Sequence, residues 1–115
     1  MNGKTIVFSG ATKNPYLFTV YPWDASLVTY GAVYVVLRRD RFGYSIIYIG
    51  RTGELSPHLS RHPLLKAFIA AGRTHVGVHL EPVISKRYAK QMDLVTNFSP
   101  DLNGGGEIFD KKLPE

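Results

Sequence analysis

Hydrophobic and polar residues follow a pattern typical of β-strands along the first half of this chain. Residues 31–36 and 44–50 are two apolar runs rich in valine, isoleucine and tyrosine, and the bend between them is charged and contains Gly43. β-branched and aromatic residues favour strands, and a polar bend with a glycine favours a turn. The two runs therefore predict a β-hairpin. Two shorter strands are predicted at 6–9 and 16–21, on either side of a turn-rich segment.

The second half of the chain carries helical signals around one further strand. Residues 75–80 alternate with a period of two, which predicts a central strand with valines and leucine on one side and histidines and glycine on the other. A short helix is expected at 55–60, and an apolar helix at 64–71 follows Pro63. A last long helix begins after Pro82. Four of its residues fall along one stripe at helical spacing, which we expect to face the sheet: Ile84, Tyr88, Gln91 and Val95.

Composition indicates one compact domain. The chain has 115 residues, 44% hydrophobic and 12% aromatic, which is enough for a core without covalent support. It has no cysteine, which excludes a disulfide framework, a thiolate zinc site and a cysteine nucleophile, and which fits a reducing compartment. No apolar run is long enough to cross a bilayer, and the first residues do not form a signal sequence. We therefore expect a cytoplasmic protein with no membrane partner.

The chain is basic, with a formal net charge of +5 and a pI near 9.6. A positive surface attracts polyanions without sequence preference, so DNA or RNA is the expected partner. Arg38, Arg39 and Arg41 crowd the hairpin bend, where they repel one another unless phosphate or Asp40 lies among them. Further residues expected to contact nucleic acid border the helices: Arg51, Lys86 and Arg87. A solvated helix face explains Lys86 equally well.

The hairpin and the segments after it carry short motifs whose order and spacing agree over residues 31–103. In chain order they are Ala32-Val33-Tyr34, Tyr48-Ile49-Gly50, Arg51-Thr52 with His58 and His62 behind them, and Gln91 followed by Leu94-Val95, Phe98, Pro100 and Asn103. This series resembles the signature of the GIY-YIG nuclease family. Two tyrosines on a half-buried sheet are also ordinary core residues, so the pattern as a whole, not either tripeptide, carries the resemblance.

The resemblance implies a fold and a chemistry. The fold would be α/β (α+β), with a small, mainly antiparallel central sheet flanked by helices. Residues 31–103 would form the nuclease-like core, 1–30 an N-terminal strand addition and 104–115 a flexible tail. The implied activity is cleavage of DNA phosphodiester bonds with one divalent cation, Mg²⁺ or Mn²⁺, in which charge stabilisation and positioning supply most of the acceleration.

Two decisive positions depart from the family pattern. His58 stands where the family has its catalytic arginine, and Gln91 stands where it has the glutamate that holds the metal. Glutamine is neutral and is a poor sole anchor for Mg²⁺. Arg61, about one turn after His58, could supply the missing guanidinium, while His58 and His62 share a helix face and could act as an acid–base pair or chelate a transition metal.

By the resemblance, each candidate residue has an expected place. Tyr34 and Tyr48 would line the cleft, Arg51 and Arg61 would contact phosphate, and Asn103 would secure the end of the last helix. His58 would lie at the arginine position with His62 beside it, and Gln91 at the metal position. The side chains of Tyr34, Tyr48 and Gln91 are expected to converge on one solvent-reachable hollow. Without the resemblance, Gln91 reads as a buried amide with satisfied hydrogen bonds.

Three hypotheses for function follow from these observations. The first is a GIY-YIG-type endonuclease, impaired or compensated at the two changed positions. The second is a non-catalytic nucleic-acid-binding module on a degenerate nuclease scaffold. The third is a protein-interaction domain whose basic residues only keep its surface hydrated.

Overall fold

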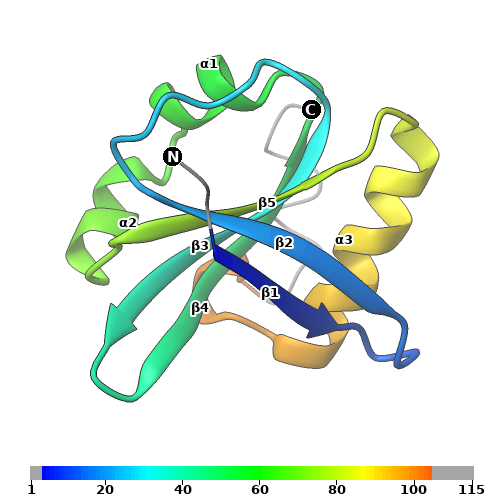
Figure 1. Cartoon of the computed structure of the whole chain (residues 1–115), viewed down its shortest axis with the longest axis horizontal. Coiled ribbons are helices and arrows are strands. Elements are labelled where there is room, and N and C mark those ends of the chain that lie inside the picture. The colour runs from blue at the N-terminus through cyan, green and yellow to red at the C-terminus, as the bar shows by residue number, and fades with distance from the viewer. Residues whose placement is uncertain (1–3, 105–115) are drawn as a thin grey trace.

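The computed structural model describes residues 4–104, which form one curled five-stranded sheet with helices packed against it (Figure 1). In chain order the elements are β1 (Lys4–Ser9), β2 (Pro15–Pro22), β3 (Ala32–Asp40), β4 (Gly43–Thr52), α1 (Leu55–Ser60), α2 (Leu65–Ala70), β5 (His75–Leu80), α3 (Ile84–Phe98) and the 3₁₀ turn η1 (Asp101–Asn103). The predicted tail, residues 104–115, lies outside the described residues except for Gly104.

The strands lie in the order β1-β2-β5-β3-β4, and all neighbouring pairs are antiparallel. The predicted α/β (α+β) fold, with a mainly antiparallel sheet flanked by helices, is therefore confirmed. β5 is the central strand, as the alternation of its residues predicts, and β1 and β2 extend the sheet beyond it. The predicted hairpin is β3–β4, closed by a two-residue tip between Asp40 and Gly43.

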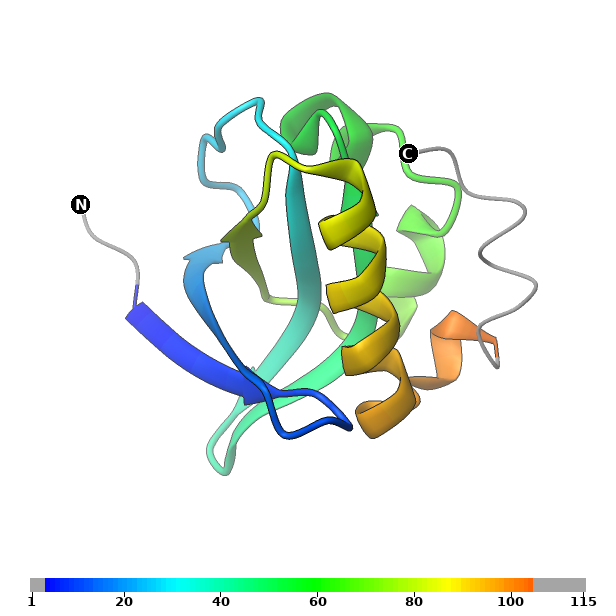
Figure 2. The same cartoon turned by 90° about the vertical axis from the view of Figure 1, so that its right-hand side faces the viewer.

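Each face of the sheet has its own hydrophobic cluster. One cluster contains Tyr34, Tyr48 and Phe68 and is covered by α1 and α2, while the other contains Ile49 and Leu94 and is covered by α3. Figure 2 shows α3 running lengthwise beside β3 and β4. Because successive side chains of a strand point to opposite faces, Tyr48 and Ile49 serve different clusters although they are neighbours in the chain.

The first turn of α3 differs from its predicted orientation. Gln91 and Val95 are buried as expected, but Ile84 and Tyr88 are 65% and 46% exposed. Arg87 is buried instead, because its guanidinium donates to the backbone carbonyls of Glu81 and Pro82, at 3.0 and 3.1 Å. The guanidinium is thus hydrogen-bonded by carbonyl oxygens at the start of the helix. A hydrophobicity pattern does not reveal such hydrogen bonds.

Leu80 also departs from the prediction. It ends β5 and is half exposed, whereas Val76 and Val78 of the same face are buried. Within residues 4–104, no helix has both the length and the apolar composition required to span a membrane.

Candidate functional site

The ring of Tyr34 crosses over Gly50, its partner on the neighbouring strand. A Cβ atom on Gly50 would fall well inside contact distance of the ring and hydroxyl group of Tyr34, so only glycine permits this approach. Across the strand, the Tyr34 hydroxyl group and Nε2 of His58 are joined by a hydrogen bond of 2.9 Å. The glycine of the Tyr48-Ile49-Gly50 motif therefore has a structural reason, which is to let Tyr34 reach α1.

An aromatic cluster surrounds the second histidine. The ring of His62 lies 5.2 Å from that of Tyr48, 4.8 Å from that of Phe68 and 5.1 Å from that of His58. Its Nδ1 accepts the backbone N–H of Leu64 at 3.0 Å, which places the proton of the neutral ring on Nε2. Burial, with a smaller contribution from His58, lowers the pKa of His62 to about 4. His62 is therefore neutral at physiological pH.

The predicted metal chelation by His58 and His62 has no support in this geometry. Nδ1 of His62 is occupied by a backbone N–H, and its Nε2 is buried. Among residues 4–104 there is no group of three His, Cys, Asp or Glu side chains that could hold a metal ion.

Both the oxygen and the nitrogen of the Gln91 amide group make hydrogen bonds within the protein. Its Oε1 accepts a hydrogen bond from the guanidinium of Arg51, and its Nε2 donates to the backbone carbonyl of Ile49 at 3.1 Å. Arg51 also lies over the ring of Tyr88, with Cζ 4.9 Å from the ring centre. The position predicted to hold a cation thus holds a neutral amide next to a permanent positive charge.

Asn103 closes the same edge of β4. Its Oδ1 accepts the N–H of Ile49 at 3.0 Å, and its Nδ2 donates to the carbonyl of Ile49 at 2.8 Å, in the manner of a neighbouring strand. Asn103 is buried, and it follows α3 by one short turn. Its contact is the free edge of β4, and this contact fixes the short turn that follows α3.

The tyrosines and Gln91 approach the same part of β4 but are not reachable by solvent. Gln91 bonds to Ile49 and Arg51, the residues on either side of the glycine that Tyr34 covers. However, Tyr34, Tyr48 and Gln91 are all 0% exposed. The predicted solvent-reachable hollow at these side chains is therefore wrong, because α1 covers the tyrosines and the amide of Gln91 is bonded to the edge of the strand.

An open hollow of about 260 Å³ lies beside the buried group instead, on the outer side of α1. His58 and Arg61 both line it, as expected for residues one turn apart, and Arg61 is exposed. The Nε of Arg61 donates to the carbonyl of Pro57 at 3.4 Å, which holds the side chain along its own helix. The remaining lining residues are Thr52, Glu54, Pro57, His62 and Pro63.

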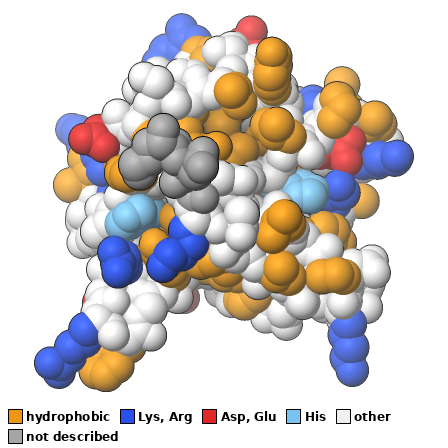
Figure 3. Space-filling model, viewed as in Figure 1, with side chains coloured by type: hydrophobic (Ala, Val, Ile, Leu, Met, Phe, Trp, Pro, Cys, Tyr) orange, Lys and Arg blue, Asp and Glu red, His pale blue; other side chains and the backbone are white. Residues whose placement is uncertain are grey.

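The basic residues expected to contact nucleic acid lie in separate places. Arg38, Arg39 and Arg41 are exposed at the hairpin end of β3–β4, whereas Arg51 lies at the opposite end of β4 beside Gln91. Figure 3 shows Lys and Arg side chains gathered at the lower left of the molecule, where the hairpin projects in Figure 1. Arg87 is buried, so its predicted role as a surface contact is wrong.

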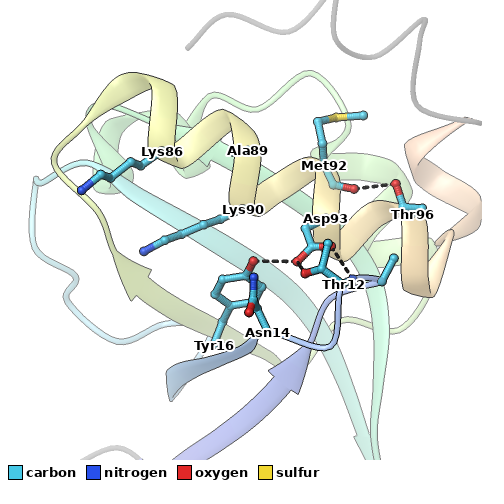
Figure 4. Close-up of a pocket in the computed structure, with 10 residues that line it drawn as sticks. Thr12, Asn14, Tyr16, Lys86, Ala89, Lys90, Met92, Asp93 and Thr96 are labelled. Carbon is cyan, nitrogen blue, oxygen red and sulfur yellow. Dashed lines mark hydrogen bonds between the residues drawn. The ribbon is translucent and has the colours of Figure 1, made fainter.

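A second, larger groove of about 610 Å³ lies between α3 and the β1–β2 turn, with Lys86 on its rim (Figure 4). Asp93 accepts hydrogen bonds here from Tyr16 and from both the backbone and the side chain of Thr12. Burial raises the pKa of Asp93, but these bonds outweigh it, and the pKa is lowered overall. Asp93 follows Gln91 by two residues on α3, yet it bonds to the β1–β2 side whereas Gln91 bonds to β4.

No protein-family profile, no curated protein and no solved structure matches this chain. The resemblance to GIY-YIG nucleases therefore stays a prediction from the motifs.

Proposed function

We propose that this chain is a cytoplasmic nucleic-acid-binding domain on a nuclease-like scaffold, which holds DNA or RNA without cleaving it. The observation that carries the proposal is the state of Gln91. Its oxygen is bonded to Arg51 and its nitrogen to the backbone of Ile49, so neither end is directed to a substrate or an ion.

Electrostatics disfavours a divalent cation at this position. Two unit charges about 4 Å apart repel by about 4 kcal/mol near a protein surface, and a divalent ion doubles this value. Arg51 supplies such a charge next to Gln91. Mg²⁺ or Mn²⁺, which the family resemblance implies, does not fit the residues present at Gln91.

Binding of polyanions is supported by the hairpin arginines. Arg38, Arg39 and Arg41 are exposed, and among the described residues no acid forms an ion pair with them. The carboxylate of Asp40 accepts the N–H of Phe42 at 2.8 Å and is thereby held in the turn. Arg38 donates one long hydrogen bond to the carbonyl of Ala71, at 3.5 Å, and the exposed guanidinium groups of Arg39 and Arg41 are available to phosphate.

A salt titration tests the binding proposal. A labelled oligonucleotide is titrated with the protein at about 50 to 200 mM salt, and the slope of log affinity against log salt is measured. Changing Arg38, Arg39 and Arg41 to serine should weaken binding and reduce the slope by about 3. The charge-matched control replaces three exposed lysines that lie outside the hairpin and outside the predicted contact set with glutamine: Lys4, Lys13 and Lys66. An equal effect of both triple variants, or no binding by the unmodified protein, would contradict the proposal.

A divalent-metal endonuclease is the second candidate, and the bond between Tyr34 and His58 favours it. This pair lies beside an open hollow that also contains Arg61, so a phosphate in the hollow would meet a guanidinium and an imidazole. Supercoiled plasmid is incubated with Mg²⁺ or Mn²⁺ and one of three proteins: unmodified, Gln91→Glu, or Gln91→Glu with His58→Arg.

The three proteins separate the two candidates. Cleavage by the unmodified protein would replace the binding proposal with the endonuclease. Cleavage that appears only in a restored variant would mean that the scaffold is suited to the reaction but lacks the residues for it. We expect no cleavage by the unmodified protein, together with salt-dependent binding.

A further inference from the structure

The tip of the β3–β4 hairpin presents an apolar ring to solvent. Phe42 is 86% exposed, the highest value among the exposed large hydrophobic residues of the described chain. The turn that holds it is well defined, because Asp40 accepts the N–H of Phe42, and Gly43 adopts a φ of +122° that favours glycine. Leaving a phenylalanine in water forgoes about 1.5–3 kcal/mol of burial, and the ring of Phe42 is accessible to a partner.

Positive charge surrounds this ring. The guanidinium carbon of Arg41 lies 5.0 Å from the centre of the Phe42 ring, and Arg38 and Arg39 precede it on β3. An arginine over one face of a ring leaves the opposite face for a second planar group. The tip thus combines a stacking surface with cations that can contact phosphate.

The same end of the sheet carries two more aromatic–basic pairs. Tyr44 packs edge-to-face on His75, with ring centres 5.4 Å apart, and Arg73 lies 4.3 Å above the ring of Trp23. Thr74 links them to the hairpin, since its carbonyl accepts the N–H of Trp23, and its hydroxyl group accepts the N–H of Arg39 at 2.8 Å. Aromatic side chains therefore continue from the hairpin tip to the residue after β2, and the last of them, Trp23, has a cation over its ring.

We propose that the hairpin tip, residues 38–44, binds single-stranded nucleic acid by stacking an unpaired base on Phe42 while its arginines contact the adjacent phosphates. This inference rests on the proposed function and specifies its ligand. Unpaired bases expose their flat faces, whereas a duplex hides those faces and offers base edges. The side chain of Phe42 has no hydrogen-bonding group with which to read a base edge, so it is suited to stacking.

The experiment compares one labelled oligothymidine strand with the same strand in a duplex with oligoadenine. The unmodified protein should bind the single strand more tightly. Phe42→Ala should weaken single-strand binding by about 5- to 150-fold, the range that corresponds to stacking of one base. Phe42→Trp should retain the affinity, and the fluorescence of the added tryptophan should be quenched on binding. Ile84→Ala, which removes another exposed apolar side chain on α3, is the matched control and should bind as the unmodified protein does.

The possible outcomes separate this inference from the function on which it rests. Equal or tighter binding of the duplex, or unchanged single-strand binding by Phe42→Ala, would overturn the stacking proposal and leave nucleic-acid binding intact. An absence of binding to either oligonucleotide at low salt would refute both. Because Phe42 projects into solvent and packs in neither hydrophobic cluster, its replacement should not unfold the protein, which thermal unfolding of each variant checks.

Discussion

Acidification from pH 7 to pH 4.5 should destabilise the protein through His62, and His62→Asn should remove this effect. His62 is 4% exposed, and its pKa is lowered to about 4, while an unfolded chain has a histidine pKa of 6.5. Between these two values the unfolded chain holds a proton at this position that the folded protein does not. The free energy of unfolding must therefore fall as the pH falls from 6.5 toward 4 and be constant, for this residue, above 6.5.

The size of the effect follows from the two pKa values. Each pH unit between them corresponds to about 1.4 kcal/mol, which sets a ceiling of about 3 kcal/mol. Because His62 also borders the open hollow, solvent screens part of the cost of its charge, and we expect about 1–2 kcal/mol. His75, whose pKa is lowered by burial and by Arg39, contributes in the same direction and is unchanged in the His62 variant.

Urea unfolding at half-unit steps from pH 4.5 to 7.5, followed by the fluorescence of Trp23, measures this dependence. Asparagine can accept the N–H of Leu64 in place of Nδ1 but cannot titrate, so the unmodified protein should show the steeper pH dependence. Parallel stability curves for the two proteins would refute the assignment of His62 as a buried neutral histidine. A pKa near 6.5 for His62 in an NMR titration of the folded protein would refute it independently.

Two further predictions concern the β4 edge. Gly50→Ala should destabilise the protein by about 1–3 kcal/mol, because the new methyl group displaces the ring of Tyr34. The control is Gly53→Ala, whose Cβ would lie 3.6 Å from its nearest neighbour and which should change stability by less than about 0.5 kcal/mol. Similar losses of stability for the two variants in urea unfolding would contradict this prediction. Asn103→Ala should lower the free energy of unfolding by about 2–4 kcal/mol, because it leaves the N–H of Ile49 without its partner. Hydrogen exchange at the amide of Ile49 should become rapid in this variant. Slow exchange at Ile49 would argue against the bond.

The fold could be predicted from the sequence to a large extent because its elements have strong local signals. The β-branched runs on both sides of Gly43 define the hairpin, and the alternation at 75–80 defines the central strand. The orientation of α3 was predictable only in its second half. Arg87 occupies the inner position of the first turn because two carbonyls and the glycine at position 31 accommodate its guanidinium, and these contacts depend on the folded chain.

The candidate site was predictable in its membership but not in its burial. The pairing of Tyr34 with Gly50 follows from the hairpin register, and the helical spacing of His58 and Arg61 brings both to one hollow. The bonds from Gln91 and Asn103 to Ile49 join segments more than 40 residues apart, and no local pattern encodes them. The sequence therefore indicates which residues gather near β4, while only the structure distinguishes a closed group from an open cleft.

The two departures from the nuclease pattern fit together in this closed arrangement. A carboxylate at position 91 would pair with Arg51, but it would also place an acceptor against the carbonyl of Ile49, where Gln91 now donates a hydrogen bond. At position 58 an imidazole ring bonds the buried hydroxyl group of Tyr34. Gln91 replaces a charged side chain with a neutral amide whose oxygen and nitrogen are both bonded inside the protein. Side chains bonded within the protein at both positions are what we expect of the proposed binding domain.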